Sequence, residues 1–221
     1  MMRLLMIFTL ACSSLLHAQE PGASDLKVRF LAERAPAGLG DVVVATEKTK
    51  SAAFALPTNF VSPPVVAPAR AFELRATAKD VVLAKVALPD AGKSFIVLLL
   101  PSPKGGYQPV VVRADDPAFK AGDVYFYNHA DKPVLGFVGT AKFVLEPGKG
   151  QTLRPAGARP EKFYDVGFGV REKEGDRALS NTRWPVDNKQ RSYIFFFNNA
   201  TTKRVDYRAV DEFVEPEKPA P

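Results

Sequence analysis

The residues best suited to binding chemistry lie close together near the C-terminal end of the chain. Trp184 is the only tryptophan; Arg183 precedes it, and Arg177 and Arg191 lie nearby in sequence. Arginine and tryptophan are the side chains most enriched where binding energy concentrates, and a guanidinium stacks on an aromatic ring or on the plane of a sugar or peptide. We therefore predict a binding site that uses Trp184, Arg183, Arg191 and Arg177. The alternative is that Trp184 fills one end of a hydrophobic core.

Few residues are suited to nucleophilic or metal chemistry. Cys12 is the only cysteine, and the two histidines are His17 and His129. His129 lies in Tyr-Asn-His-Ala-Asp, which is typical of a strand that ends in a turn rather than of a catalytic base. Cys12 and His17 both lie in the N-terminal segment that we expect to be cleaved, so the remaining chain has no cysteine and one histidine; this excludes a blue-copper site, and no spaced cluster indicates zinc. No Gly-x-Ser-x-Gly, P-loop or dinucleotide fingerprint occurs. We expect no catalytic residue, no metal and no cofactor.

Aspartates offer the remaining route to catalysis. Glycosidases use two carboxyl groups that flank the scissile bond, and a turn rich in aspartate can bind calcium, although no Asp-x-Asp-x-Asp-Gly loop is present. Each candidate also lies where a turn or strand edge favours aspartate. The candidates are Asp115, Asp116, Asp123, Asp131 and Asp165.

The elements that must position these residues are β-strands. Val28, Phe30 and Ala32 alternate with more polar neighbours, whereas residues 96–100 and 194–197 are unbroken apolar runs, as in strands buried on both faces. No window carries a capped helical stripe. The 19 prolines and 15 glycines divide the chain into short segments. This pattern predicts β-sandwiches or barrels.

Ordered matches between the two halves predict an internal duplication. Lys-Ser-Phe-Ile around Ser94 recurs as Arg-Ser-Tyr-Ile around Ser192. Such matches predict tandem modules at residues 25–115 and 120–214, joined so closely that the modules pack together. The other matches pair Leu74 with Leu153, Phe60 with Phe137, and Asp80 with Asp165.

The second module is longer than the first. Its extra length includes residues 172–177, which favour a hairpin tip, and residues 179–184, which favour the return strand. We therefore predict an inserted hairpin within residues 172–191. Residues 215–221 are polar and proline-rich, which predicts a disordered or extended tail.

The first residues form a targeting pattern. A positive start at Arg3, a short apolar run and a small residue at Ala18 are typical of a secretory signal peptide over residues 1–18. The alternative is a lipoprotein signal cleaved before Cys12. The chain is then exported, to the periplasm or the cell surface, with no transmembrane segment and no nucleic-acid partner. Its net charge of +6 suits anionic polymers or lipid headgroups.

Two families resemble parts of the chain. Residues 143–154 are similar to a strand-turn-strand element in the first domain of periplasmic pilus chaperones, although here the segment lies in the second module. Residues 27–31 and 91–97 resemble an uncharacterised extracellular domain that occurs in tandem in bacterial surface proteins. This second resemblance implies an immunoglobulin-like fold and no activity.

Together these patterns predict an all-β chain of two tandem immunoglobulin-like β-sandwich modules related by duplication. We expect a non-catalytic binding, adhesion or scaffolding protein of the cell envelope. Its partner would be an envelope protein or an anionic or polysaccharide polymer. One alternative is a chaperone-like protein that binds subunits by adding a strand at an exposed edge. The second alternative is a carbohydrate-active enzyme with paired carboxylates.

Overall fold

A computed structural model describes residues 25–214, so the predicted signal peptide, Cys12 and the tail at 215–221 lie outside the described residues. The described chain is all-β and forms sixteen strands. It contains no helix long and apolar enough to cross a membrane. The prediction of an all-β chain is confirmed.

The first eight strands form one sandwich of two four-stranded sheets. The inner sheet, which faces the second module, has the order β4-β1-β7-β8, and the outer sheet has the order β3-β2-β5-β6. The strands are β1 (Lys27–Ala32), β2 (Asp41–Ala45), β3 (Phe54–Ala55), β4 (Val65–Val66), β5 (Ala71–Ala76), β6 (Val81–Ala87), β7 (Ser94–Pro101) and β8 (Tyr107–Arg113).

The next eight strands repeat this order. The inner sheet is β12-β9-β15-β16 and the outer sheet is β11-β10-β13-β14, so each strand corresponds to the one eight places earlier. In both modules the first strand pairs in parallel with the seventh. The strands are β9 (Val124–Asn128), β10 (Val134–Val138), β11 (Ala141–Leu145), β12 (Gly150–Leu153), β13 (Phe163–Glu172), β14 (Gly175–Pro185), β15 (Gln190–Asn198) and β16 (Val205–Phe213).

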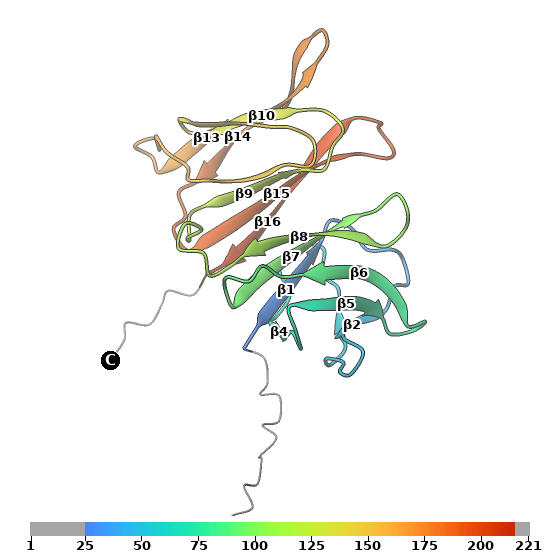
Figure 1. Cartoon of the computed structure of the whole chain (residues 1–221). Helices are drawn as coiled ribbons and strands as arrows, with labels where there is room; N and C mark the ends of the chain where they lie inside the picture. The colour runs from blue at the N-terminus through green and yellow to red at the C-terminus, as the bar shows by residue number, and fades with distance from the viewer. Residues whose placement is uncertain (1–24, 215–221) are drawn as a thin grey trace, which may run out of the picture.

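The four sheets stack as four layers, with the two inner sheets in the middle (Figure 1). Each sandwich has its own hydrophobic core, around Phe30 and Leu74 in the first module and around Phe126 and Phe168 in the second. A third core joins the two inner sheets and includes Leu98 and Phe195. The short connection predicted that the modules pack together, and they do.

The apolar runs explain the third core. In β7, Ile96, Leu98 and Leu100 face the second module, whereas the alternate residues, such as Val97, face the core of their own module, and all are fully buried. In β15 the alternation is the same, with Phe195 facing the first module. Side chains alternate between the two faces of a strand, so a strand between two apolar layers needs an unbroken apolar run. This part of the sequence prediction is confirmed.

The predicted match of Ser94 with Ser192 holds for the strand but not for the face. Ser94 and Ser192 lie on corresponding strands, but Ser94 shares the face of Ile96, toward the other module, and Ser192 shares the face of Ile194, toward its own core. A doubly buried strand has no polar alternation to fix register, and a shift of one residue exchanges the faces.

The remaining matches pair strands or turns that do not correspond. Leu74 lies in β5 and Leu153 in β12, whereas the counterpart of β5 is β13. A register irregularity follows Leu74 in the β5–β6 pair and Phe168 in the β13–β14 pair, so Phe168 is the structural counterpart of Leu74. Phe60 and Asp80 lie outside strands, but Phe137 and Asp165 lie within them.

Charged or titratable groups cross the junction at several points, and two of these contacts involve a buried carboxylate. Glu212 in β16 is buried; it forms an ion pair with Arg29 of β1, accepts a hydrogen bond from the Tyr193 hydroxyl at 2.6 Å, and lies 3.4 Å from the Arg191 Nε. The second contact joins His129 Nδ1 to the carboxylate of buried Glu33, at 2.6 Å. His129 follows β9 directly, as the sequence predicted.

Two tyrosines at the junction predict sensitivity to alkali. Burial raises the pKa of Tyr125 to about 12, and burial together with the Glu212 carboxylate raises the pKa of Tyr193 well above its ordinary value. In the unfolded chain both hydroxyls ionise near pH ~10, so the folded state binds more protons above that pH and loses stability as pH rises. For Tyr125 the loss between about pH 10 and 12 is about 2–3 kcal/mol. Urea unfolding of Tyr125→Phe across this range should show a smaller loss than the parent chain, and an equal loss would contradict the assignment.

Candidate functional site

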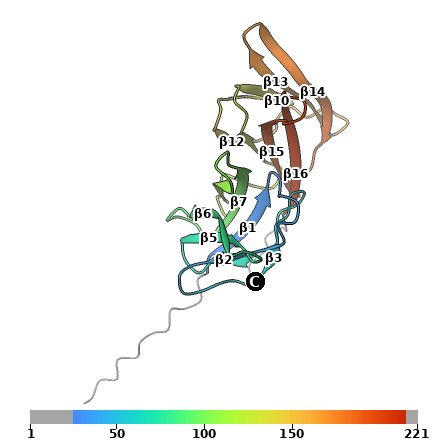
Figure 2. The ribbon, with the colours of Figure 1, turned by 90° about the vertical axis from the view of Figure 1, so that its right-hand side faces the viewer.

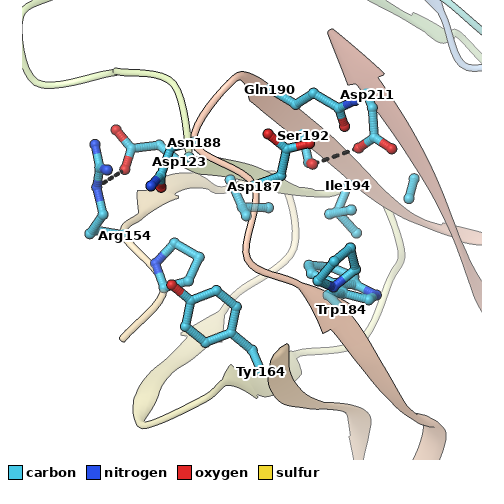
Figure 3. Close-up of a pocket in the computed structure, with 15 residues that line it drawn as sticks. Asp123, Arg154, Tyr164, Trp184, Asp187, Asn188, Gln190, Ser192, Ile194 and Asp211 are labelled. Atoms are coloured by element: carbon cyan, nitrogen blue, oxygen red, sulfur yellow. Dashed lines mark hydrogen bonds and ion pairs between the residues drawn. The ribbon is translucent and has the colours of Figure 1, made fainter. Parts of the chain in front are cut away.

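A pocket opens at one end of the second sandwich, between its inner and outer sheets. We call it the end pocket; it is lined by the beginning of β9, β13 and β15, the end of β14, and part of β16, and its volume is about 180 Å³. The side chains that matter most for its chemistry are Asp123, Tyr164, Trp184, Asp187, Ser192 and Asp211 (Figure 3).

One wall of the end pocket is aromatic. Tyr164 and Trp184 are partners in the β13–β14 register and are both half-buried. The Trp184 ring packs edge-on against the core residue Phe168, with 5.7 Å between ring centroids. The sequence left open whether Trp184 is a core or a binding residue. The structure places it at the border, where it contacts the core and lines the pocket.

The opposite wall carries acids. Ser192 and Asp211 are partners in the β15–β16 register, and the Ser192 hydroxyl donates a hydrogen bond to the Asp211 carboxylate at 2.6 Å. The Asp187 carboxylate accepts a hydrogen bond from the Lys189 backbone N–H at 2.7 Å. Within residues 25–214 neither Asp187 nor Asp211 forms an ion pair with a basic side chain.

The third acid, Asp123, has a structural role. It is buried, forms an ion pair with Arg154, and accepts a hydrogen bond from the Lys120 backbone N–H at 2.7 Å. A buried carboxylate needs such partners because burial without them is unfavourable. Asp123 is therefore neutralised by its neighbours, and the uncompensated charge of the pocket comes from Asp187 and Asp211.

The corresponding end of the first module is lined differently. There Leu26, Leu88 and Phe95 lie just before β1, just after β6 and at the start of β7, and all three belong to the buried core. Apolar side chains therefore fill the first module at the place where the second has Trp184 and Ser192. The end pocket is a specialisation of the second module on a shared strand order.

The four predicted binding residues do not form one site. Trp184 alone lines the end pocket. Arg183 is its neighbour on β14 and therefore points to the opposite face, where its guanidinium lies 4.7 Å from the Phe163 ring centroid. Arg177 lies near the hairpin tip, with its Nε 3.4 Å from the Glu172 carboxylate. The prediction assumed that residues close in sequence lie close in space. In a strand, neighbouring side chains point to opposite faces, so Arg183 and Trp184 cannot share one site.

Arg191 belongs to the module junction. It is 5% exposed, donates a hydrogen bond to the Ala114 carbonyl at 2.8 Å, and stacks over the Phe119 ring at 4.8 Å from its centroid. With its ion pair to Glu212 it holds the connection between the modules in place. Its side chain is therefore committed to the protein's own structure.

Sequence reasoning missed most of the pocket. Tyr164, Ser192 and Asp211 lie on three different strands that only the sheet packing brings together. Asp187 lies in the loop that follows Trp184, so its nearness to that residue in the sequence could have indicated it.

The predicted hairpin exists, but it is an extension rather than an insertion. Its turn lies between Glu172 and Gly175, as predicted, and the return strand includes residues 179–184. By strand order the β13–β14 pair is the counterpart of β5–β6, with both strands lengthened, and the extra length projects beyond the module (Figure 2). The arms are continuous with the outer sheet, so no separate element was added.

The two alternative functions depend on paired aspartates and on an exposed edge strand at the module junction, and neither feature is assembled as predicted. Asp115 and Asp116 are held by Arg113, Asp165 is bound by Arg159 at 2.7 Å, and only Asp123 reaches the end pocket. The longest edge strand is β14, which belongs to the outer sheet and not to the module junction. Among the residues that the structure describes, no group of three or more His, Cys, Asp or Glu side chains is placed to hold a metal ion.

No family model matches the chain, and no curated protein matches it significantly.

Proposed function

We propose that this chain is a non-catalytic binding protein of the cell envelope, exported by its N-terminal leader, and that its partner enters the end pocket. The observation that carries the proposal is the pair of half-exposed aromatic rings, Tyr164 and Trp184, at the open end of one module. Aromatic side chains in a concave site with a few convergent polar groups are typical of ligand-binding pockets.

The rest of the molecule supports a scaffold that presents this pocket. The third core joins the modules through fully buried side chains such as Leu98 and Phe195. Buried charges, such as Glu212 with Arg29, add specific contacts across the same junction. Part of the pocket wall, including Tyr164, Trp184 and Ser192, belongs to strands of this frame, which favours a preorganised site.

The chemistry of the pocket favours binding over catalysis. The most buried acid, Asp123, is held by Arg154 and a backbone N–H, as expected for a structural carboxylate. Asp211 accepts a hydrogen bond from the Ser192 hydroxyl at the surface, where Asp211 is exposed and Ser192 is half-buried. A glycosidase instead places two free carboxyl groups on either side of the scissile bond.

The test uses the only tryptophan of the chain as its reporter. Because Trp184 lines the pocket, a ligand that enters should change its fluorescence directly. We expect one class among neutral oligosaccharides, anionic polysaccharides and basic peptides to produce a saturable change. Replacing Trp184 with alanine should weaken binding of that ligand, measured by calorimetry, by about 2 kcal/mol or more.

The same test includes the unfolding free energy of Trp184→Ala and a control variant on the same strand. Trp184 is half-buried, so Trp184→Ala should lower the free energy of unfolding by about 1–3 kcal/mol, less than a fully buried aromatic would. Arg183→Ala is the control, because Arg183 lies on the other face of the same strand. If no ligand class perturbs Trp184, or if both variants weaken binding equally, the end pocket is not the binding site.

A second candidate function, capture of an extended segment by strand addition, is favoured by β14. Within the described chain this strand pairs with β13 alone, which leaves its other backbone edge open. An open edge can accept a strand from another chain. The edge lies beside the end pocket, since Trp184 and Pro185 belong to both.

A further inference from the structure

We propose that the end pocket binds the basic side chain of a lysine or arginine that a partner protein presents in an extended segment. This inference rests on the proposed function, because it names the ligand chemistry of the same pocket. Three observations carry it: the uncompensated acids, the aromatic wall, and the open edge of β14.

The charge of the pocket is opposite to that of the chain. The protein carries a net charge of +6, yet Asp187 and Asp211 line the end pocket without a salt-bridge partner among residues 25–214. Such a pair attracts a cation locally, and the attraction strengthens as a ligand displaces water from the pocket. The basic composition predicted anionic polymers as partners, but at this pocket the sign of the charge disfavours them.

The aromatic wall fits the same ligand. A lysine ammonium or an arginine guanidinium is attracted to the face of tryptophan and tyrosine rings. The apolar stem of such a side chain can pack on Trp184 and Pro155 while its charged end reaches the acids on the opposite wall (Figure 3). A volume of about 180 Å³ suits one slender side chain.

The edge of β14 favours a peptide as the carrier of the cation. Trp184 and Pro185 end this edge strand and line the end pocket. In strand addition the backbone of the added segment supplies affinity, and pockets that take alternate side chains supply specificity. An extended segment along β14 would therefore place one of its side chains at the mouth of the pocket. An amino sugar offers the same charge but no backbone to pair with the strand.

The experiment measures binding of three matched probes to the full chain by Trp184 fluorescence and calorimetry. The probes are a blocked pentapeptide with one central lysine between alanines, the same peptide with that lysine acetylated on Nζ, and glucosamine. We expect the lysine peptide to bind and acetylation to weaken binding about ten-fold or more, because a charge-assisted contact is lost. Glucosamine should bind more weakly than the lysine peptide.

Substitutions of single acids measure how much each carboxylate contributes to binding of the lysine peptide. Asp211→Asn and Asp187→Asn keep the size and one hydrogen-bond acceptor of the side chain but remove its charge, so each should weaken lysine-peptide binding by about ten-fold. Asp206→Asn is the control, because Asp206 is an exposed acid on β16 that does not line the pocket. Thermal unfolding of each variant verifies that it remains folded.

The outcomes are distinguishable. Equal binding of the acetylated and unmodified peptides, or tighter binding of glucosamine, overturns this inference. A neutral oligosaccharide that perturbs Trp184 when the lysine peptide does not also overturns it, but leaves the end pocket as the binding site. If no probe or polymer perturbs Trp184, the proposed function itself fails.

Discussion

Replacing Phe195 with alanine is expected to destabilise the whole protein by about 3–5 kcal/mol, the usual cost of removing a buried aromatic side chain. Phe195 is fully buried and lies in the third core, between the two inner sheets. Its removal leaves a cavity that neither β-sheet can close without shifting its strands. Thermal and urea unfolding, followed by circular dichroism, measure the change.

The location of Phe195 between the modules also predicts a change in the number of unfolding transitions. Because the third core couples the modules, the parent chain should unfold in one transition, and Phe195→Ala should separate or broaden it. Phe213→Ala is the matched control, since Phe213 is 60% exposed and its loss should change stability by no more than about 0.5 kcal/mol. Equal effects of the two substitutions would show that the modules do not depend on this junction.

Replacing Glu212 with alanine is expected to cost about 3–5 kcal/mol, because it leaves buried or half-buried cations without their counter-charge. Glu212 is 4% exposed and is the common partner of Arg29, Arg191 and the Tyr193 hydroxyl. A buried ion pair adds little net stability, but breaking it is unfavourable since one charge remains desolvated. Urea unfolding at neutral pH measures the loss.

Two further variants make this second prediction specific. Glu212→Gln keeps an acceptor for Tyr193 and should lie between the parent chain and the alanine variant. A double-mutant cycle with Arg191→Ala should recover part of the loss, because the double variant no longer buries an unpaired guanidinium. Additive effects of the two alanine substitutions would contradict the contact between them. An exposed acid such as Glu146 provides the control.

Sequence patterns predicted the elements well because they are local. The alternation around Phe30 and the unbroken run at residues 96–100 each indicate which faces of one strand are buried. The same runs failed to align the modules, since a strand without polar positions looks alike when shifted by one residue. The two modules share one strand order, while their common ancestry stays a prediction.

The candidate site was predicted only in part, because it is not local. Trp184 was identified by its type, but Tyr164 and Asp211 reach the end pocket from distant parts of the chain. Arg191 was assigned to the site for the same reason that it is needed at the junction: a guanidinium forms many strong contacts. Which contacts it forms depends on Glu212 and Ala114, and no sequence spacing encodes those partners.

The parallel pairing of first and seventh strands governs how each module must fold. Lys27 pairs with Ser94, and Val124 pairs with Ser192, so each opening strand finds its central neighbour only near the end of its own module. Closing such a long loop is entropically unfavourable, and sandwiches built this way fold in about milliseconds to seconds. A growing chain that ends before residue 94 lacks the strand that joins both cores, so a nascent module stays open until almost all of it has been synthesised.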